Sequence, residues 1–249
     1  MDDEAGDSQF GYERVSARDK TRRVRGVFDS VAERYDLMND LMSGGLHRLW
    51  KRYAVELLDV RADHVVLDLA GGTADLSRLI ARRAAGVRVV CSDINARMLA
   101  RGRDRSLDAG HASDIVYVQA NAERLPFASA SLDRVIIGFG LRNVTYKSAA
   151  LAEMARVLRP GGRAVVLEFS TVQAPLLARL YETYSFRVLP RLGGLVARDA
   201  DSYRYLAESI RVHPDQDALA FMMERAGFAS VRYHNLLGGV VAVHVGWTA

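Results

Sequence analysis

Short apolar runs alternate with amphipathic stretches through the middle of this chain of 249 residues. The first run, VVLDL at 65–69, has the length and β-branched content of a central strand in a parallel sheet, and a glycine pair ends it sharply. Alternating strands and helices predict a parallel sheet with right-handed crossovers, whose ligands bind at the carboxyl ends of the strands. The predicted strands are 65–69, 88–92, 115–122, 131–140 and 162–170, and the predicted helices are 75–84, 95–108 and 147–158.

The segments on either side of this core have other patterns. Residues 1–17 are polar and acidic, which predicts a disordered or loosely attached tail. Residues 18–58 repeat apolar positions at helical spacing and precede the first strand, so they can form a helical lid over the ligand site. Residues 174–214 lack a strand pattern and are interpreted as an insertion on the substrate side. A helix at 216–228 and two strand-like runs within 231–247 predict a closing antiparallel hairpin.

These elements together predict an α/β, Rossmann-like fold. Its sheet has seven strands, mostly parallel, and the last two form the C-terminal antiparallel hairpin. The length allows one large domain with a full core, so we expect a single domain over 18–249.

A candidate binding site lies where the first strand turns into the helix after it, in the sequence DLAGGTADL. Gly71 and Gly72 permit the positive backbone dihedrals of a tight turn and let a ligand approach the N–H groups of the helix. Asp68 lies within the strand, and Asp93 ends the next strand, where a carboxylate can accept hydrogen bonds from ribose hydroxyls. The G-x-G-x-x-G pattern of dinucleotide sites is missing, which favours a nucleoside cofactor such as S-adenosylmethionine. The alternative is an ordinary strand-to-helix turn.

Composition narrows the class of protein further. The chain is 49% hydrophobic and 26% charged, and no run approaches the ~18 apolar residues that span a bilayer. The acidic N-terminus lacks the features of a signal peptide, so we expect a cytoplasmic protein. A net charge of +4 permits contact with nucleic acid or anionic lipid but establishes neither. Cys91, the only cysteine, lies within an apolar run and is interpreted as a packed hydrophobe. We predict no metal site.

Several longer segments carry a resemblance to a known family. They are YDLMNDLMSGGLHRLWKR, LDLAGGTADL, YVQANAERLPF, FGLRNVT, VLEFS, DADSYRYLAESIRVHPDQ and GGVVAVHVG. Together they resemble the UbiE family of ubiquinone and menaquinone C-methyltransferases, over about residues 24–246. The resemblance implies the class I S-adenosylmethionine-dependent methyltransferase fold.

The resemblance also implies which residues bind the cofactor, S-adenosylmethionine. These are Thr73, Asp93, Asn121, Ala122 and Gly138, beside the turn formed by Asp68, Gly71 and Gly72. Three positions depart from the pattern of the family, which usually has glycine at Ala74, often serine at Gly138 and usually aspartate at Tyr146. We expect alanine at 74 to cost about 1 kcal/mol if its backbone is left-handed.

The implied reaction is methyl transfer to a ring carbon of a prenylated quinol, either a benzoquinol, a naphthoquinol or both. Arg142 is predicted to stabilise the phenolate, because a guanidinium stays protonated, and Asn143 to orient the ring hydroxyl. Tyr203 or His213 is the candidate base, and a buried structural role is the alternative for each. The implied partners are the quinol, a membrane surface in transient contact, and either a second copy of the chain or a quinone-biosynthesis complex. The expected location is therefore cytoplasmic, peripheral at the inner face of the membrane.

Three other functions remain open at this level: methylation of another small molecule, methylation of nucleic acid, and a non-catalytic cofactor-binding scaffold. Enzymes that methylate exocyclic amines of bases have an N-P-P-Y-like loop after the fourth strand, where this chain has Gly138-Phe139-Gly140-Leu141. Enzymes that methylate cytosine carbon need a cysteine there, and Cys91 lies in another strand. We therefore expect no nucleic-acid partner.

Overall fold

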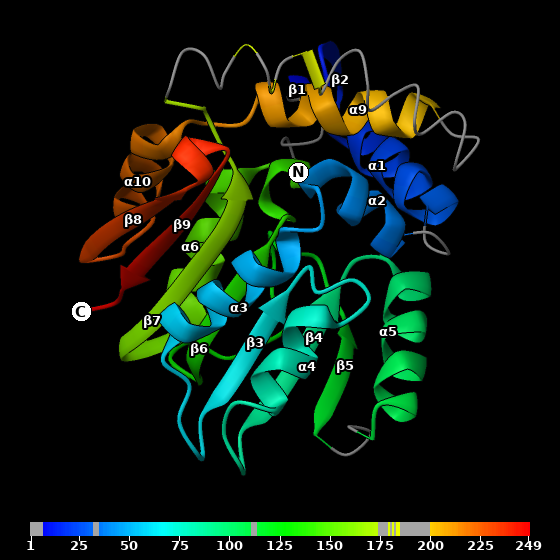
Figure 1. Cartoon of the computed structure of the whole chain (residues 1–249). Helices are drawn as coiled ribbons and strands as arrows, with labels where there is room; N and C mark the ends of the chain where they lie inside the picture. The colour runs from blue at the N-terminus through cyan, green and yellow to red at the C-terminus, as the bar shows by residue number, and fades with distance from the viewer. Residues whose placement is uncertain are drawn as a thin grey trace.

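A computed structural model of the chain describes residues 7–31, 35–110, 114–173, 179, 181, 183–184 and 200–249. Within them, seven strands form one sheet in the order β5-β4-β3-β6-β7-β9-β8 (Figure 1). Five strands are parallel and the last two are antiparallel, which confirms the predicted sheet. The strands are β3 (Val65–Leu69), β4 (Arg88–Asp93), β5 (Ile115–Gln119), β6 (Leu132–Gly138), β7 (Leu158–Phe169), β8 (Ser230–Leu236) and β9 (Val241–Trp247).

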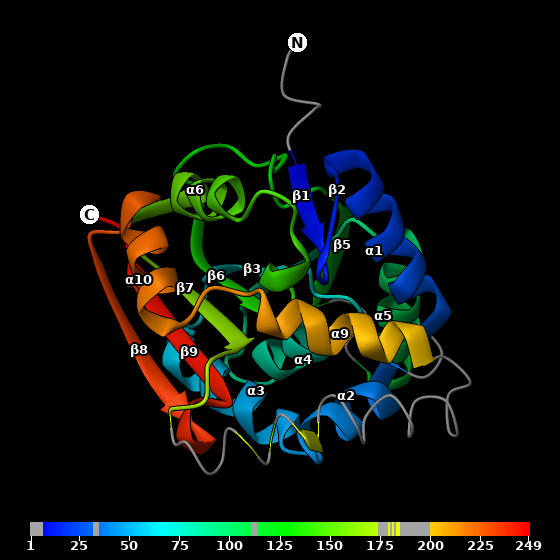
Figure 2. The same ribbon diagram turned by 90° about the horizontal axis from the view of Figure 1, so that it is seen from above.

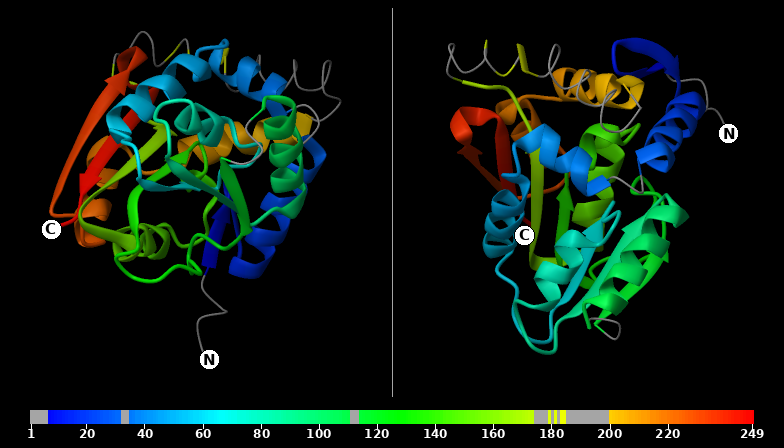
Figure 3. Two further views of the ribbon diagram at one scale, coloured as in Figure 1. Left: turned by 90° about the horizontal axis from the view of Figure 1, so that it is seen from below. Right: turned by 45° about the vertical axis from the view of Figure 1, so that its right-hand side comes forward.

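Helices cover both faces of the sheet (Figure 3, left). α3 (His47–Leu58), α4 (Asp75–Ala81) and α5 (Ala96–Asp108) contribute to one hydrophobic cluster with Val66 of β3. α6 (Lys147–Val157) and α10 (Gln216–Arg225) contribute to a second cluster with Leu67. Successive side chains of a strand point to opposite faces, so the unbroken apolar runs of the central strands supply both clusters.

A third layer lies across the carboxyl ends of the parallel strands (Figure 2). It contains α1 (Ala17–Val31), α2 (Tyr35–Ser43), α9 (Ala200–Arg211) and the hairpin of β1 (Asp7–Phe10) and β2 (Glu13–Ser16). α1 contacts α5 on one side and α9 on the other. Because β3 has β4 on one side and β6 on the other, this layer covers the place where the chain changes direction across the sheet, which is the usual ligand site.

The predicted tail over residues 1–17 is wrong for residues 7–16, which form the β1–β2 hairpin. Gly11, with φ +58°, provides the turn. The Phe10 ring stacks on Tyr205 of α9 with 4.1 Å between ring centroids, and the Tyr12 N–H donates to Glu208 at 3.4 Å. Distant aromatic partners therefore order a segment whose own composition is polar. Residues 1–6 lie outside the described residues.

The predicted lid over 18–58 divides into parts with different places. α1 covers the strand ends, but α3 packs on the face of the sheet against β6, β7 and β9, because Ala54, Val55 and Leu58 are buried there. The insertion predicted over 174–214 is described mainly by α9, and residues 174–178, 180, 182 and 185–199 lie outside the described residues.

Several predicted boundaries differ by a few residues. α4 ends at Ala81 rather than 84, and β7 begins at Leu158 rather than 162. Hydrogen bonds to Thr248 hold residues 159–162 in extended β7. None of the helices in the described ranges is long and apolar enough to cross a membrane.

Candidate active site

A cavity of about 860 Å³, its open mouth included, lies between the carboxyl ends of β3 to β6 and the underside of α1. Its walls come from the strand ends, the loops after them and one face of α1. The lining residues from α1 are Thr21, Val24, Arg25 and Phe28, and those from the strand ends include Ala70, Gly72, Asp93, Asn121, Ala122, Phe139 and Asn143.

The turn between β3 and α4 forms one wall of the cavity. Its backbone is left-handed at Ala70, Gly72 and Ala74, with φ values of +53°, +54° and +62°. Gly71 has an ordinary φ but no free space, because a Cβ there would lie 2.7 Å from Cys91 Sγ and 2.8 Å from Asp68 Oδ2. The glycine pair therefore serves two needs: a left-handed backbone at 72 and a close approach of the chain to its own strands at 71.

Asp93, at the end of β4, lies against this turn. Its carboxylate accepts the N–H of Gly72 at 3.0 Å and the N–H of Asn95 at 2.8 Å. Burial raises the pKa of Asp93 to about 6, and these two hydrogen bonds oppose the rise. Each carboxylate oxygen keeps a lone pair, so the group can still accept hydrogen bonds from a vicinal diol.

Asp68 faces away from the cavity, into the root of the turn. Its Oδ2 accepts the N–H of Ser77 at 2.9 Å and the Ser77 hydroxyl at 2.6 Å. Burial raises the pKa of this carboxyl to about 7. Among the described residues, Asp68 Oδ1 and Thr73 Oγ1 are buried without a hydrogen-bond partner. Neither residue lines the cavity, but Thr73 is next to Gly72, which does. An unpaired hydroxyl at that place in the turn fits a polar ligand such as the methionine end of S-adenosylmethionine.

The other predicted cofactor residues divide between the cavity and the core. Asn121 and Ala122 line the cavity after β5, and the Asn121 side chain accepts the N–H of Glu123 at 3.0 Å. Gly138 does not line it. A Cβ at 138 would lie 2.6 Å from Cδ1 of Leu76, so glycine there makes room for α4.

Arg142 lies in a short 3-10 helix after β6, and its side chain does not line the cavity. Its Nη1 lies 2.7 Å from Glu168 Oε1 and 2.7 Å from the Phe139 carbonyl, and the guanidinium stacks 5.5 Å from the Phe169 ring centre. Arg142 and Glu168 are 4% and 1% exposed. A buried carboxylate therefore neutralises the guanidinium that the sequence assigns to phenolate stabilisation.

Asn143, the next residue, does line the cavity. Its Oδ1 accepts the Tyr205 hydroxyl at 3.0 Å, so the amide NH₂ can serve as a donor. Tyr203, one of the two candidate bases, is almost fully buried in the hydrophobic cluster of α3 and α4. Tyr205 thus contacts a residue of the cavity wall, but neither Tyr203 nor Tyr205 lines the cavity itself.

His213, the other candidate base, is buried just after α9. Among the described residues, neither ring nitrogen has a hydrogen-bond partner. Burial, and after it the charges of Lys147 and Arg142, lower the pKa of His213 well below its usual range. The imidazole is therefore neutral near pH 7, and its surroundings disfavour protonation. His213 does not line the cavity.

Polar contacts at both ends hold α1 over the cavity. Near its N-terminus the Lys20 ammonium donates to the Val144 carbonyl at 3.1 Å. Near its C-terminus Asp29 accepts the amide of Asn95 at 2.9 Å. The same β6–α6 loop is fixed from below by Glu123, whose Oε1 accepts the N–H groups of residues 145 and 146 at 3.0 and 2.9 Å. Glu123 supplies the negative charge at the start of α6 that aspartate at 146 would otherwise bring.

Residues 16–248 match the model of the ubiE/COQ5 methyltransferase family. The chain belongs to this family. It is 55% identical over 240 residues to the ubiquinone/menaquinone biosynthesis C-methyltransferase UbiE of Saccharophagus degradans, with 96% of each chain covered. It is 58% identical over 242 residues to the protein of that name from Methylococcus capsulatus, with 96% of this chain and 97% of the relative covered.

Solved structures agree with the fold of this ubiE/COQ5 family member. A SAM-dependent methyltransferase of Thermotoga maritima matches with a TM-score of 0.63 at 18% identity, covering 91% of this chain and 100% of that one. One from Aquifex aeolicus matches with a TM-score of 0.59 at 11% identity, covering 86% and 98%. The fold prediction is confirmed. Family and fold imply S-adenosylmethionine as the methyl donor, and the chain is a methyltransferase.

Sequence reasoning missed two residues of this site in the ubiE/COQ5 chain. Glu168 is the one acid in the apolar run of β7, and an acid in such a run indicates a buried cation as partner. Gly102 of α5 packs directly against the turn between β3 and α4, since a Cβ there would lie 3.0 Å from the Gly72 carbonyl oxygen. No local pattern marks Gly102, because a helical glycine without a positive φ looks like a weak helix residue.

We predict that affinity for S-adenosylhomocysteine depends on pH through Asp93. Below about pH 6 the free carboxyl binds a proton, which it must lose before it can accept both ribose hydroxyls. Affinity should therefore fall by about tenfold per pH unit below about 6 and level off above it. Titration calorimetry between pH 5 and 8 measures this.

The Asp93→Asn variant is the control, because it should bind weakly and lose this dependence. We would assign any pH dependence of the affinity that remains in Asp93→Asn to Asp68, whose pKa is raised to about 7. A flat profile for the unmodified protein would contradict the prediction.

We predict that Ala74→Gly changes the free energy of unfolding by less than about 1 kcal/mol and keeps or improves cofactor affinity. Relief of the left-handed alanine gains about 1 kcal/mol, and loss of the buried methyl costs about 0.8 kcal/mol. Urea denaturation and calorimetry measure the two quantities. Ala130→Gly is the matched control, since Ala130 has φ +52° but an exposed methyl. A tenfold loss of affinity in Ala74→Gly would mean that the Cβ holds the turn.

Proposed function

We propose that this protein methylates a ring carbon of a prenylated quinol in the biosynthesis of ubiquinone, menaquinone or both, with S-adenosylmethionine as the donor. The observation that carries the proposal is the match to relatives of that name, at 55% and 58% identity and almost full coverage of both chains. The fold alone would allow other substrates, because class I methyltransferases act on many classes of molecule.

The residues around the turn after β3 would hold the cofactor. Asp93 would accept hydrogen bonds from the ribose, and Asn121 and Ala122 would flank the adenine. Thr73 Oγ1 and the N–H groups of the turn would face the methionine end, which explains why that hydroxyl has no partner among the described residues. When bound, S-adenosylmethionine supplies an electrophilic methyl group on a sulfonium.

Ring methylation needs an electron-rich ring and a place for the proton that the quinol loses. We assign the proton to His213, because its neutral imidazole has two unpaired nitrogens within the described structure. Its lowered pKa requires that a negative phenolate beside it favour the protonated ring. We assign Asn143 to the ring hydroxyl, since Tyr205 holds the amide oxygen and leaves the NH₂ group to donate. Arg142 would act indirectly, by holding the Phe139 carbonyl and the loop that carries Asn143, because Glu168 neutralises its charge. Tyr203 would support α9 from the core.

The quinol also determines the proposed location. A prenyl tail partitions into the bilayer, so an enzyme that takes such a substrate must meet the membrane surface at least transiently. We therefore place the protein in the cytoplasm, at the inner face of the membrane. A second copy of the chain or a quinone-biosynthesis complex is the expected assembly there.

We predict transfer of a labelled methyl group from S-adenosylmethionine to a demethylated quinol. The assay compares a benzoquinol, a naphthoquinol and a tail-free analogue of each, with the product identified by mass spectrometry. Methylation of a ring carbon in either quinol supports the proposal, and preference for the tailed form supports contact with the tail. Cofactor binding without methylation of any of the four would contradict it, as would transfer only to RNA or DNA added as competitor.

We predict that His213→Ala lowers kcat by about 100-fold or more and leaves the Kd for S-adenosylhomocysteine within twofold, because loss of a general base affects proton removal only. Stopped assays and calorimetry give the two values. His234→Ala is the control, because His234 is an exposed histidine on β8 that contacts Tyr53 instead. Unchanged kcat in His213→Ala would leave His213 a structural role.

A further inference from the structure

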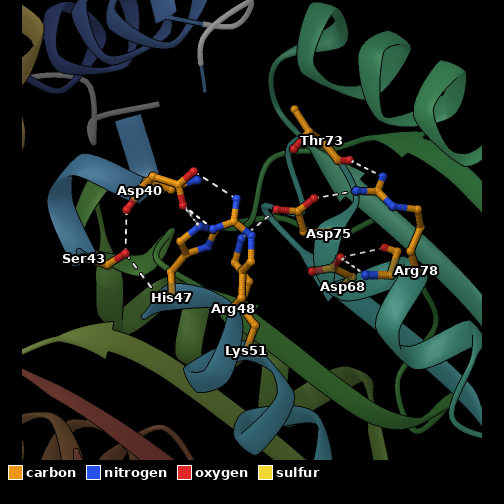
Figure 4. Close-up of polar contacts among 11 residues, drawn as sticks. Asp40, Ser43, His47, Arg48, Lys51, Asp68, Thr73, Asp75 and Arg78 are labelled. Carbon is orange, nitrogen blue, oxygen red and sulfur yellow. Dashed lines mark hydrogen bonds and ion pairs between the residues drawn. The ribbon is translucent and has the colours of Figure 1, made fainter. Parts of the chain in front are cut away.

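A buried lysine reaches the cofactor turn from a helix that does not line the cavity. Lys51 lies on α3, and its side chain is 7% exposed. Its Nζ lies 2.8 Å from Oδ2 of Asp75, in the first turn of α4 (Figure 4). Lysine is almost never buried to this extent without a partner, so the pair indicates a specific requirement at this position.

The pair continues into the turn through a second cation. Oδ1 of Asp75 accepts Nη2 of Arg78 at 2.5 Å, and Nη1 of Arg78 donates to the Thr73 carbonyl at 2.8 Å. Figure 4 shows these side chains in one row from α3 to the turn. Lys51, Asp75, Arg78 and the Thr73 carbonyl therefore form a connected chain, which we call the Lys51 relay.

The Lys51 relay ends at the most constrained part of the turn between β3 and α4. Thr73 lies between Gly72, whose N–H binds Asp93, and Ala74, which has φ +62° without being glycine. Gly102 of α5 packs against the other side, where a Cβ would lie only 3.0 Å from the Gly72 carbonyl oxygen. The carbonyl of Thr73 thus has to keep one orientation if the Thr73 hydroxyl is to face the cavity side of the turn.

α3 is a firm anchor for the relay. The buried ring of His47, at its start, lies 3.0 Å from Asp40 of α2, and Nη2 of Arg48 donates to the same carboxylate at 2.9 Å (Figure 4). At the other end, Arg134 of β6 donates to the carbonyls of Leu58 and residue 59 at 2.9 and 3.3 Å. The position of Lys51 is therefore set by contacts on both sides of it.

We propose that Lys51 and Asp75 are positioning residues for cofactor binding, which fix Thr73 through Arg78. This inference rests on the proposed function, in which residues 70–74 hold S-adenosylmethionine. The Lys51 charge also opposes the rise in the pKa of the neighbouring Asp68 that burial causes. α3 thus influences the turn between β3 and α4, although no residue of α3 lines the cavity.

The test separates positioning from simple stabilisation. Lys51→Met leaves Asp75 paired with Arg78, whereas Lys51→Met combined with Asp75→Asn removes the Lys51–Asp75 pair as a whole and leaves Arg78 its bond to the Thr73 carbonyl and an amide oxygen in place of the carboxylate. Replacing a buried ion pair by neutral groups is often close to neutral for stability. If the pair only stabilised the fold, the double variant would recover both melting temperature and affinity. If it positions Thr73, the double variant recovers the melting temperature alone.

We expect the Kd for S-adenosylhomocysteine to rise about tenfold or more in both variants, with the KM for the quinol unchanged. Lys51→Arg should restore the Kd to within about threefold, since it keeps the cation. The Kd is measured by calorimetry 15 °C or so below the lowest melting temperature. Arg156→Met is the control, because it removes a partly buried cation from an ion pair with Glu153 on α6, on the other face of the sheet, and should leave the Kd unchanged.

Three results would overturn the inference. They are an unchanged Kd in the double variant, an equal loss of affinity in Arg156→Met, and no recovery in Lys51→Arg. Failure of the unmodified protein to bind S-adenosylhomocysteine would instead refute the proposed cofactor site at residues 70–74, and this inference with it. Failure to methylate a quinol while the Kd values behave as expected would refute only the proposed substrate.

Discussion

The turn between β3 and α4 can form only where no side chain occupies two particular places. A Cβ at Gly71 would overlap Asp68 and Cys91, and a Cβ at Gly102 would meet the backbone of the turn itself. β3, β4 and α5 therefore all pack closely against the backbone of this turn. In the resulting conformation the N–H of Gly72 points at Asp93, and the two residues form a polar wall of the cavity.

Four carboxylates near the cavity fall into two groups with different partners. Asp75 and Glu168 each contact a buried cation, which neutralises their charges. Asp68 and Asp93 have only uncharged N–H and O–H donors, and burial raises the pKa of both. The first group fixes geometry, whereas the second keeps the capacity to respond to a ligand that brings hydroxyl or ammonium donors.

The layer above the strand ends joins distant parts of the chain around one cavity. The N-terminal hairpin and α9 meet where Phe10 stacks on Tyr205, and Tyr205 in turn donates to Asn143 on the cavity wall. α1 is tied to the β6–α6 loop through Lys20 and to the start of α5 through Asp29. Cofactor cavity and proposed quinol side therefore share a cover made of residues from both ends of the chain.

The sequence by itself determined the sheet, the glycine turn, Asp93 and the family, because each depends on neighbouring residues: a run of β-branched side chains, a glycine pair, an acid at a strand end. It did not determine which buried charges meet. Glu168 lies 26 residues from Arg142, and Asp75 lies 24 residues from Lys51. The β1–β2 hairpin likewise depends on α9, almost 200 residues away. Only the tertiary structure decided these pairs, because a buried charge or ring is stabilised by whatever the fold brings against it, and local pattern carries no record of that partner.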